Sequence, residues 1–449
     1  MTLRVLLVPG PPPDGVIENG QDRYLDSLVK GMAGCVRYAY LEDPQYARGP
    51  DKKWEPGVAA TVSKPRNRFV AILPGAIRLL LGYARDVWRL ARILRPYRHQ
   101  ADIIHVNRVG CEVQPIAARL AGFKNIVTTI HNLPGDHSPG MVERWVERLS
   151  FFCGTRHIAV AEATFDAWHS RIGLARKKTV TIYNGMDPDS LDGFDRRAYR
   201  AQFCTDPEHT FIIGICARLH RMKGHAILLE AVKQLLEGTA EGGGRGEREE
   251  GGGRKAEGGG RKAEGGSQQV SYSSSLTPHP SSFLLLIAGE GPERGRIEAK
   301  IAELGLGEHV RMLGHWDDPT GFAAAIDLNV LPSIEQETIG YQNIEAMFAG
   351  VPSVVSDYGG MKEIVGQSGG GRVVPAGDRN ALADVLLYYI NNPDAARHDG
   401  AAAQAYARAN LTAEIMAHKT ARVYEQMMEN GRHAAVRGER EEREERDET

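Results

Sequence analysis

At 449 residues the chain is longer than one hydrophobic core usually supports, so two domains of roughly 200 residues each are expected. The 55 basic and 57 acidic residues almost cancel, which excludes the strongly basic character of a general nucleic-acid binder. The five cysteines are scattered and form no C-x-x-C pair, so they exclude a disulfide framework and a structural zinc site and favour the reducing cytoplasm.

Short apolar runs alternate with helical patterns through the N-terminal half. This alternation predicts a parallel α/β sheet within an N-terminal domain at 1–190. The runs lie at 3–8, 103–106, 126–130, 158–160 and 180–182.

The segment 72–98 combines apolar residues at helical spacing with six arginines. Two interpretations stay open. It is an ordinary domain helix with a solvated arginine face, or it rests on an anionic membrane at the cytoplasmic face, where a lipid-linked acceptor is presented.

A second set of apolar runs begins near residue 211 and predicts a second parallel sheet, within a C-terminal domain at 208–405 after a linker at 191–207. The segment 238–282 interrupts this domain with glycine runs, a serine run and a tandem GGGRKAE. Such a composition buries too little apolar surface to fold, so we expect a disordered insertion, either merely tolerated or serving as a tether for a partner.

The C-terminal end has two parts. Apolar residues recur at helical spacing within 406–430, behind an N-cap at Thr412, and predict a helix that packs back on the protein. The remainder, 431–449, is a run of charges that we expect to be a disordered, solvated tail.

Two loops of the C-terminal half contain charged residues whose spacing indicates a binding site. Arg218 and Lys223 lie five residues apart between a buried strand and a helix, which makes a natural clamp for a diphosphate. Farther along, Gly340 opens a short helix whose free N–H groups suit a phosphate, while Glu337 and Glu345 can accept hydroxyl hydrogen bonds from one polyhydroxylated ligand.

These two motifs, R-x4-K at Arg218 and Lys223 and E-x7-E at Glu337 and Glu345, resemble those of the glycosyltransferase family 4 enzymes (group 1). Further matches follow in family order: a glycine-rich loop at Asn19 and Gly20, strand-ending histidines at His105 and His131, an interdomain entry at 182–187, a glycine turn at 288–292 and a strand and turn at 310–315. Ala161 stands where the family commonly has serine. The resemblance covers nearly the whole chain outside the insertion and the tail.

The resemblance implies a GT-B fold, in which two Rossmann-like parallel-sheet α/β domains face each other across a cleft. It also implies a hexosyltransferase-like, retaining enzyme of polysaccharide biosynthesis that uses no metal and no cofactor. Such an enzyme moves a sugar from a nucleotide diphosphate sugar donor, held mainly by the C-terminal domain, to a glycan, lipid-linked or small-molecule acceptor.

Site roles are carried over in the same way. Catalytic roles fall to His131, Arg218, Lys223 and Glu337, with the two cations stabilising the departing diphosphate. Glu337 would bind the donor sugar, Glu345 the ribose and His131 a sugar hydroxyl, whereas His105 is interpreted as structural. Further donor contacts are expected from Gly20, Gly289, Gly291, His315, Thr338, Ile339, Gly340 and Tyr341.

Two other functions remain as alternatives. A non-hydrolysing nucleotide-sugar epimerase would use the same fold and the same donor, but the paired motifs speak against it. A non-catalytic scaffold protein would keep the fold and use the insertion as its tether. Asp187-Pro188-Asp189 has the D-x-D form of a metal-binding motif, but its place at the interdomain entry favours a turn or capping role.

Overall fold

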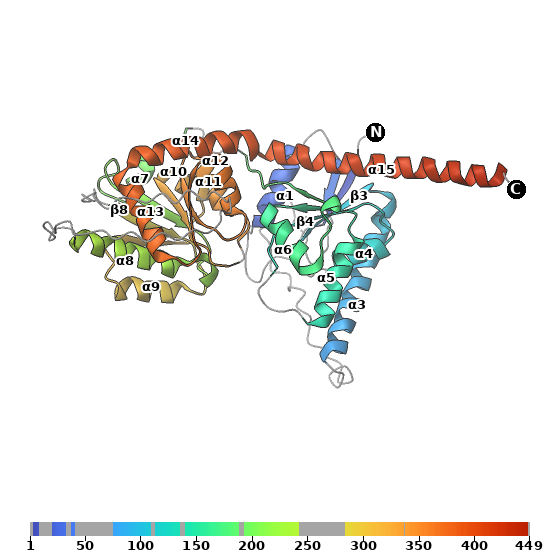
Figure 1. The fold of residues 1–449 in the computed structure, drawn as a ribbon, viewed down its shortest axis with the longest axis horizontal. Helices are drawn as coiled ribbons and strands as arrows, with labels where there is room; N and C mark the ends of the chain where they lie inside the picture. Colours follow the sequence, from blue (N-terminus) through green and yellow to red (C-terminus); the bar gives the residue numbers. More distant parts are fainter. Residues whose placement is uncertain are drawn as a thin grey trace, which may run out of the picture.

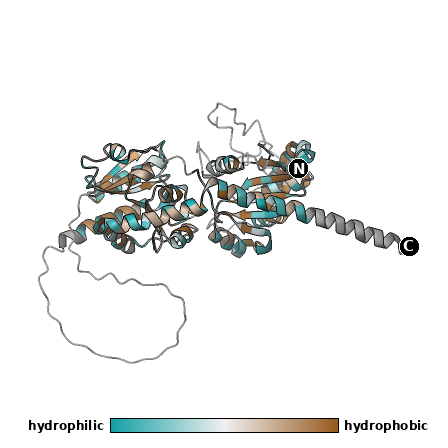
Figure 2. Cartoon of the chain, turned by 90° about the horizontal axis from the view of Figure 1, so that it is seen from above, coloured by the Kyte–Doolittle hydropathy of each residue, from teal (hydrophilic) through white to brown (hydrophobic). Residues whose placement is uncertain are grey.

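The computed structural model describes residues 3–8, 20–32, 37–40, 75–108, 113–134, 140–187, 193–241, 283–335 and 337–447. They form two α/β halves that lie side by side, with the last two helices running across both of them (Figure 1). Hydrophobic residues gather inside each half, and hydrophilic residues face outward on the helices (Figure 2).

The N-terminal half is built on a parallel sheet with strand order β2-β1-β3-β4-β5-β6. Its strands are β1 (Arg4–Val8), β2 (Arg37–Tyr40), β3 (Ile103–Arg108), β4 (Ile126–Ile130), β5 (Arg156–Ala159) and β6 (Thr179–Thr181). Its helices are α1 (Gly20–Gly31), α3 (Gly75–Leu94), η1 (Arg95–His99), α4 (Gln114–Leu120), α5 (Met141–Cys153), α6 (Glu162–Ile172) and η2 (Arg176–Lys178). The central strands are buried because helices cover both faces, although β3 and β4 also hold the buried polar residues His105, Asn107, Thr128 and Thr129.

The C-terminal half has a second parallel sheet, with strand order β12-β11-β10-β7-β8-β9. Its strands are β7 (Phe211–Cys216), β8 (Phe283–Ala288), β9 (Val310–Gly314), β10 (Leu328–Leu331), β11 (Ser353–Ser356) and β12 (Gly371–Val374). The chain builds outward from β7 on one side and then on the other, so the direction of its connections reverses between β7 and β10. In open α/β sheets, ligands bind beyond the strand ends at such a reversal.

The helices of this half surround the sheet. They are α7 (Arg196–Arg200), η4 (Arg221–Lys223), α8 (His225–Glu241), α9 (Arg294–Glu303), α10 (Pro319–Ala325), α11 (Tyr341–Phe348), α12 (Met361–Ser368), α13 (Arg379–Asn391) and α14 (Pro393–Asn410). The final helix, α15 (Ala413–Asp447), leaves this half and packs against α1 of the other.

The chain passes between the halves twice, and the two crossings are bonded to each other. Met186, on the outward crossing, donates its N–H to Leu411 O at 3.0 Å and accepts from the Ala413 N–H at 2.9 Å on the return. The expected N-cap is confirmed, because Thr412 Oγ1 accepts the Ile415 N–H at 3.1 Å.

Three sequence expectations need correction. The expected linker 191–207 contains α7, which is docked on the C-terminal half: Arg200 is 5% exposed, pairs with Asp327 at 2.9 Å and donates to Ala325 O. Helix α8 continues to Glu241, into the expected insertion; the rest of 238–282 lies outside the described residues. The expected disordered tail is helical to Asp447, consistent with the high helix propensity of arginine and glutamate.

Candidate active site

Arg218 and Lys223 follow β7 at the point where the strand order reverses. Arg218 is exposed, and no carboxylate among the described residues pairs with it. Lys223, in η4, forms an ion pair with Glu337 from the loop after β10. The two loops are also joined through their backbones, since Ile334 donates its N–H to Met222 O at 2.8 Å. The sequence-predicted cations and Glu337 therefore lie together.

A glycine turn after β8 fixes the loop that carries Arg218. Leu219 donates its N–H to Glu290 O at 2.9 Å. A Cβ on Gly289, whose φ is +134°, would lie 2.0 Å from Ala217 O, and one on Gly291 would lie 2.3 Å from Leu219 O. The structure thus gives both glycines a packing role beneath the clamp loop, and their direct contact with a donor stays a prediction.

Glu337 is buried and held by its surroundings. It is 7% exposed, and its Oε2 accepts from Ser333 Oγ at 3.2 Å as well as from Lys223. Gly340 is the N-cap of α11 with φ +69°, and no side chain of the described residues caps the helix. The first N–H groups and the positive end of the α11 dipole are therefore not neutralised by a capping side chain.

The other residues predicted on this motif differ in accessibility. Ile339 is fully buried in a cluster with Ala161 and Met186, so only its backbone is available to a ligand. Tyr341 packs against the core of the N-terminal half, and Thr338 is half-buried. Glu345 is 1% exposed, so its predicted contact with a ribose would require this part of α11 to become uncovered.

His131 follows β4 in the N-terminal half and is 5% exposed. Its Nε2 lies 2.5 Å from Asn107 Oδ1, and its ring meets Tyr24 edge-on with centroids 4.7 Å apart. Burial, followed by the nearby His105, lowers the pKa of His131 to about 3, so the ring is neutral. Because Nε2 donates to the amide oxygen, Nδ1 is an acceptor suited to a sugar hydroxyl.

His105 has both ring nitrogens engaged, at 2.6 Å from Tyr424 Oη and 2.7 Å from Thr129 Oγ1. Burial lowers its pKa to about 3. The interpretation of His105 as structural is confirmed, and it also ties α15 to β3 and β4.

The Glu337 and His131 segments meet at the glycine pair that follows β11. A Cβ on Gly359 would lie 1.8 Å from Glu337 O and 3.5 Å from Leu133, two residues after His131. A Cβ on Gly360 would lie 2.4 Å from that of Ala161. These contacts bring the strand ends of the two halves together at the predicted site.

Glu363 on α12 makes a contact between the halves that sequence reasoning left unassigned. Its carboxylate accepts the N–H groups of Glu162 at 2.9 Å and Ala163 at 2.6 Å, and the hydroxyl of Tyr183 at 3.1 Å. Ala161 is the N-cap of α6 and offers no capping side chain, so a carboxylate from the other half caps the helix instead. The alanine in the usual serine position was the available signal.

The remaining predicted residues lie apart or are less well placed. Gly20 begins α1, whereas Asn19 lies outside the described residues. His315 follows the edge strand β9, two strands from β7, and its exposed ring lies 3.0 Å from Asp317.

Of the three residues of the D-x-D at 187–189, the structure describes only Asp187. Within the described ranges, no group of three or more His, Cys, Asp or Glu side chains could hold a metal ion.

Both halves of the chain match known protein families. Residues 19–190 match the family described as Glycosyltransferase Family 4, and residues 273–406 match Glycosyl transferases group 1. A phosphatidyl-myo-inositol mannosyltransferase of Mycobacterium leprae (strain TN) is 38% identical over 150 residues, 33% of this chain and 39% of that protein. A 2-deoxystreptamine glucosyltransferase of Streptomyces kanamyceticus is 24% identical over 316 residues, 66% of this chain and 70% of that protein. The match thus spans about two fifths of the mannosyltransferase.

A solved structure shares the whole architecture. Anabaena Alr3699/HepE in complex with UDP and glucose superposes with a TM-score of 0.64 at 19% identity, covering 94% of this chain and 100% of the other. The likeness shows that the two have the same two-domain fold.

Proposed function

Because the chain belongs to the group 1 and family 4 glycosyltransferases with the GT-B fold, we propose that it transfers a sugar from a nucleoside diphosphate sugar to an acceptor hydroxyl, with retention and without a metal. The observation that carries this proposal is the unpaired guanidinium of Arg218 beside the Lys223–Glu337 ion pair, at the reversal between β7 and β10. It offers positive charge for a diphosphate next to a carboxylate for a sugar.

Each group has a distinct proposed task. Arg218 and Lys223 stabilise the charge that develops on the departing diphosphate, with the uncapped N-terminus of α11 adding its dipole. Glu337 accepts hydrogen bonds from donor-sugar hydroxyls while it orients Lys223. His131, neutral and fixed by Asn107, accepts one more sugar hydroxyl through Nδ1.

Retention is proposed to proceed by attack on the same face of the sugar. The bond from C1 to the β-phosphate oxygen breaks with both electrons going to phosphate, the acceptor oxygen bonds to C1, and the acceptor proton passes to the departing phosphate. Glu337 is a poor covalent nucleophile because Lys223 and Ser333 already bind its carboxylate.

The test is calorimetric binding of UDP, GDP and ADP in the presence of a chelator. We expect one nucleotide to bind the wild type, and the Arg218→Ala/Lys223→Ala variant to bind it about 100-fold more weakly, since each lost charge-assisted bond contributes roughly 1.5 kcal/mol. Glu337→Gln should keep nucleotide affinity, because Lys223 retains its charge, yet lose sugar transfer.

The control is Arg197→Ala, which removes an exposed arginine on α7 that is already paired with Glu208 and belongs to neither clamp loop. It should bind like the wild type. Nucleotide binding that survives the Arg218→Ala/Lys223→Ala change would refute the clamp, as would a strict requirement for a divalent ion. Donor conversion without any acceptor would instead favour the epimerase, and absence of all binding would favour the non-catalytic scaffold.

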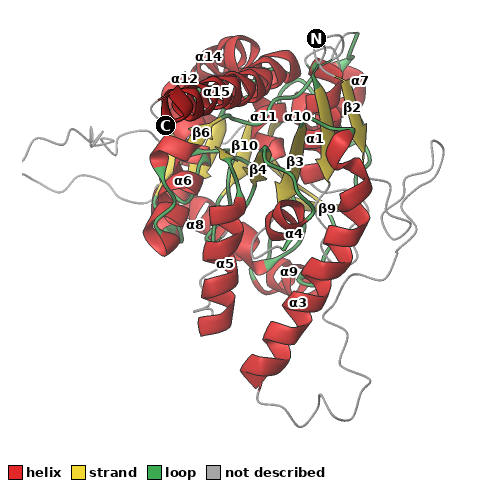
Figure 3. Cartoon of the chain, turned by 90° about the vertical axis from the view of Figure 1, so that its right-hand side faces the viewer, coloured by secondary structure: helices red, strands yellow, loops and turns green. Residues whose placement is uncertain are grey.

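The acceptor is proposed to be presented at a membrane surface. Helices α3 and α5 are in contact and project from the same side of the N-terminal half (Figure 3). Trp88 on α3 is 61% exposed, and Trp145 and Phe152 on α5 are 66% and 76% exposed. Aromatic residues flanked by arginines suit a lipid–water interface, and one relative is named for a phosphatidyl-inositol lipid. Across the described residues, every helix is too short or too polar to cross a bilayer.

Vesicle sedimentation tests this surface. Trp88→Ser/Trp145→Ser should abolish binding to vesicles that contain anionic lipid, because it removes apolar area from both helices. Leu120→Ser is the matched control, since Leu120 is 68% exposed but lies on α4. Equal sedimentation of the double variant and the wild type would contradict membrane contact. It would favour the other interpretation of α3, that of an ordinary domain helix with a solvated arginine face.

A further inference from the structure

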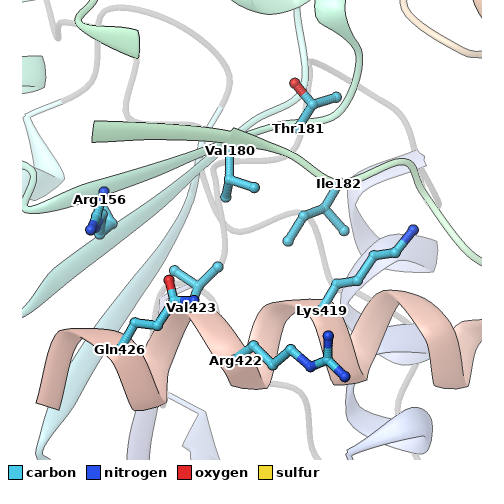
Figure 4. A pocket seen from close by; sticks show the side chains of 8 residues that line it. All are labelled: Arg156, Val180, Thr181, Ile182, Lys419, Arg422, Val423 and Gln426. Atoms are coloured by element: carbon cyan, nitrogen blue, oxygen red, sulfur yellow. The ribbon is translucent and has the colours of Figure 1, made fainter. Parts of the chain in front are cut away.

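A cavity lies between the edge strand β6 and the C-terminal helix α15, and none of its lining residues belongs to the predicted active site. Its volume is about 210 Å³, and its wall residues come from β5, from β6 with the following Ile182, and from α15. Val180 and Ile182 point from the strand toward the helix, and Val423 faces them from α15 (Figure 4). These three side chains provide an apolar floor.

Cations stand at both ends of this floor: Arg156 from β5 at one end, and Lys419 and Arg422 from α15 at the other (Figure 4). None of the described residues that line the cavity is acidic. Lys419 and Arg422 are exposed, and the described part of the chain offers neither of them a carboxylate within ion-pair distance. Arg156 donates to a neutral backbone group, Lys177 O, at 2.5 Å. Within the described ranges, this positive charge is therefore not balanced by a paired carboxylate.

We propose that this cavity binds a small phosphomonoester, with the phosphate on Lys419 and Arg422 and the carbon portion on Val180 and Val423. Lysine and arginine are the usual phosphate ligands, and charge-assisted bonds of this kind are strong. The volume is below the ~300–1,000 Å³ of sites for drug-sized ligands, which favours a small molecule.

The free molecule is favoured over a lipid headgroup by the shape of the protein. Helix α15 crosses one side of the molecule, while α3 and α5 project from the opposite side (Figures 1 and 3). A membrane in contact with α3 and α5 would not reach the cavity. A bound phosphomonoester would instead link α15 to the edge of the N-terminal sheet, close to the crossings between the halves.

The experiment uses glycerol 3-phosphate as the probe and the full chain carrying Arg218→Ala/Lys223→Ala, so that the diphosphate clamp does not contribute. We expect a saturable calorimetric signal and a rise in Tm, because a ligand that binds only the folded state stabilises it. Adding Lys419→Ala/Arg422→Ala should weaken binding about tenfold or more. Inorganic phosphate should bind more weakly than the ester, and glycerol should not bind.

The matched control adds Arg296→Ala/Lys300→Ala on α9, two cations one turn apart whose charges are taken up by Glu293 and Glu230. It should leave binding unchanged. Lys419→Gln/Arg422→Gln provides a milder pair if the alanine variant fails to fold. No binding of the ester, or binding unaffected by the α15 variants, would overturn the proposal. So would binding confined to vesicles that contain phosphatidic acid, because the occupant would then be a lipid.

Discussion

At the scale of single residues, the site depends on which charges are paired and which are not. Arg218 and Lys223 lie five residues apart in the sequence, yet their ion pairing differs in the structure. Lys223 is paired with Glu337, whereas no carboxylate of the described residues pairs with Arg218. The motifs predict the residues, but the pairing depends on β7 lying beside β10. No local pattern contains that information.

His225, immediately after the clamp, links the site to pH. It is 3% exposed, neither ring nitrogen has a partner among the described residues, and burial, followed by the charge of Lys223, lowers its pKa to about 4. In the unfolded chain the pKa is near 6.5. Between these two pH values the unfolded state therefore binds more protons than the folded state. The stability that is present above about pH 6.5 is lost as the pH falls toward about 4.

We predict that His225→Gln reduces this acid sensitivity. The difference in unfolding free energy between about pH 7.5 and about pH 5 should be roughly 2 kcal/mol smaller than in the wild type. The measurement is urea unfolding of each protein at both pH values. His418→Gln, at an exposed position on α15, is the control. An unchanged pH difference in His225→Gln would show that His225 does not titrate in this way.

At the scale of elements, the strands were the easiest part to predict. Central strands of a parallel sheet are covered on both faces, so they appear in the sequence as continuous apolar runs, as β7 and β8 do. The edge strands β2 and β12 were missed because RYAY and GRVV are short and partly polar. Helix α7 was missed because its five residues are too few to show an apolar periodicity, and because the buried contacts of Arg200 that help to hold it are not visible in the sequence.

The glycine turn after β8 provides the test at this scale. Gly289→Ala would place a methyl group against Ala217 O with an unfavourable φ, so it should cost about 3 kcal/mol or more and displace Arg218. Gly305→Ala is the matched control, since φ is +66° but no atom lies within 4 Å, and it should cost only about 1 kcal/mol. Thermal unfolding and nucleotide binding would be measured for both. Equal effects would mean that close packing under the clamp loop is unimportant.

At the scale of the whole molecule, the two halves are joined by contacts that no single half contains. The crossings pair at Met186 and Thr412, α15 returns to α1, and Glu363 caps α6 from across the junction. The sequence indicates two domains and a returning helix from periodicity alone. It does not reveal that one carboxylate bonds two backbone N–H groups in the other half, because that contact requires both domains to be folded and in place.

Glu363→Gln is the sharpest test of this junction. The loss of charge at the α6 N-terminus should cost roughly 1 kcal/mol and loosen the halves. Small-angle scattering should then show a larger radius of gyration. Nucleotide affinity should persist because the clamp lies within the C-terminal half, whereas transfer should slow because His131 is no longer held beside the donor. Adding Ala161→Ser restores a local cap to α6, so it should recover stability but neither compactness nor transfer. Recovery of all three would mean that Glu363 acts only as a helix cap, and the coupling between the halves would then rest on α15 and the paired crossings.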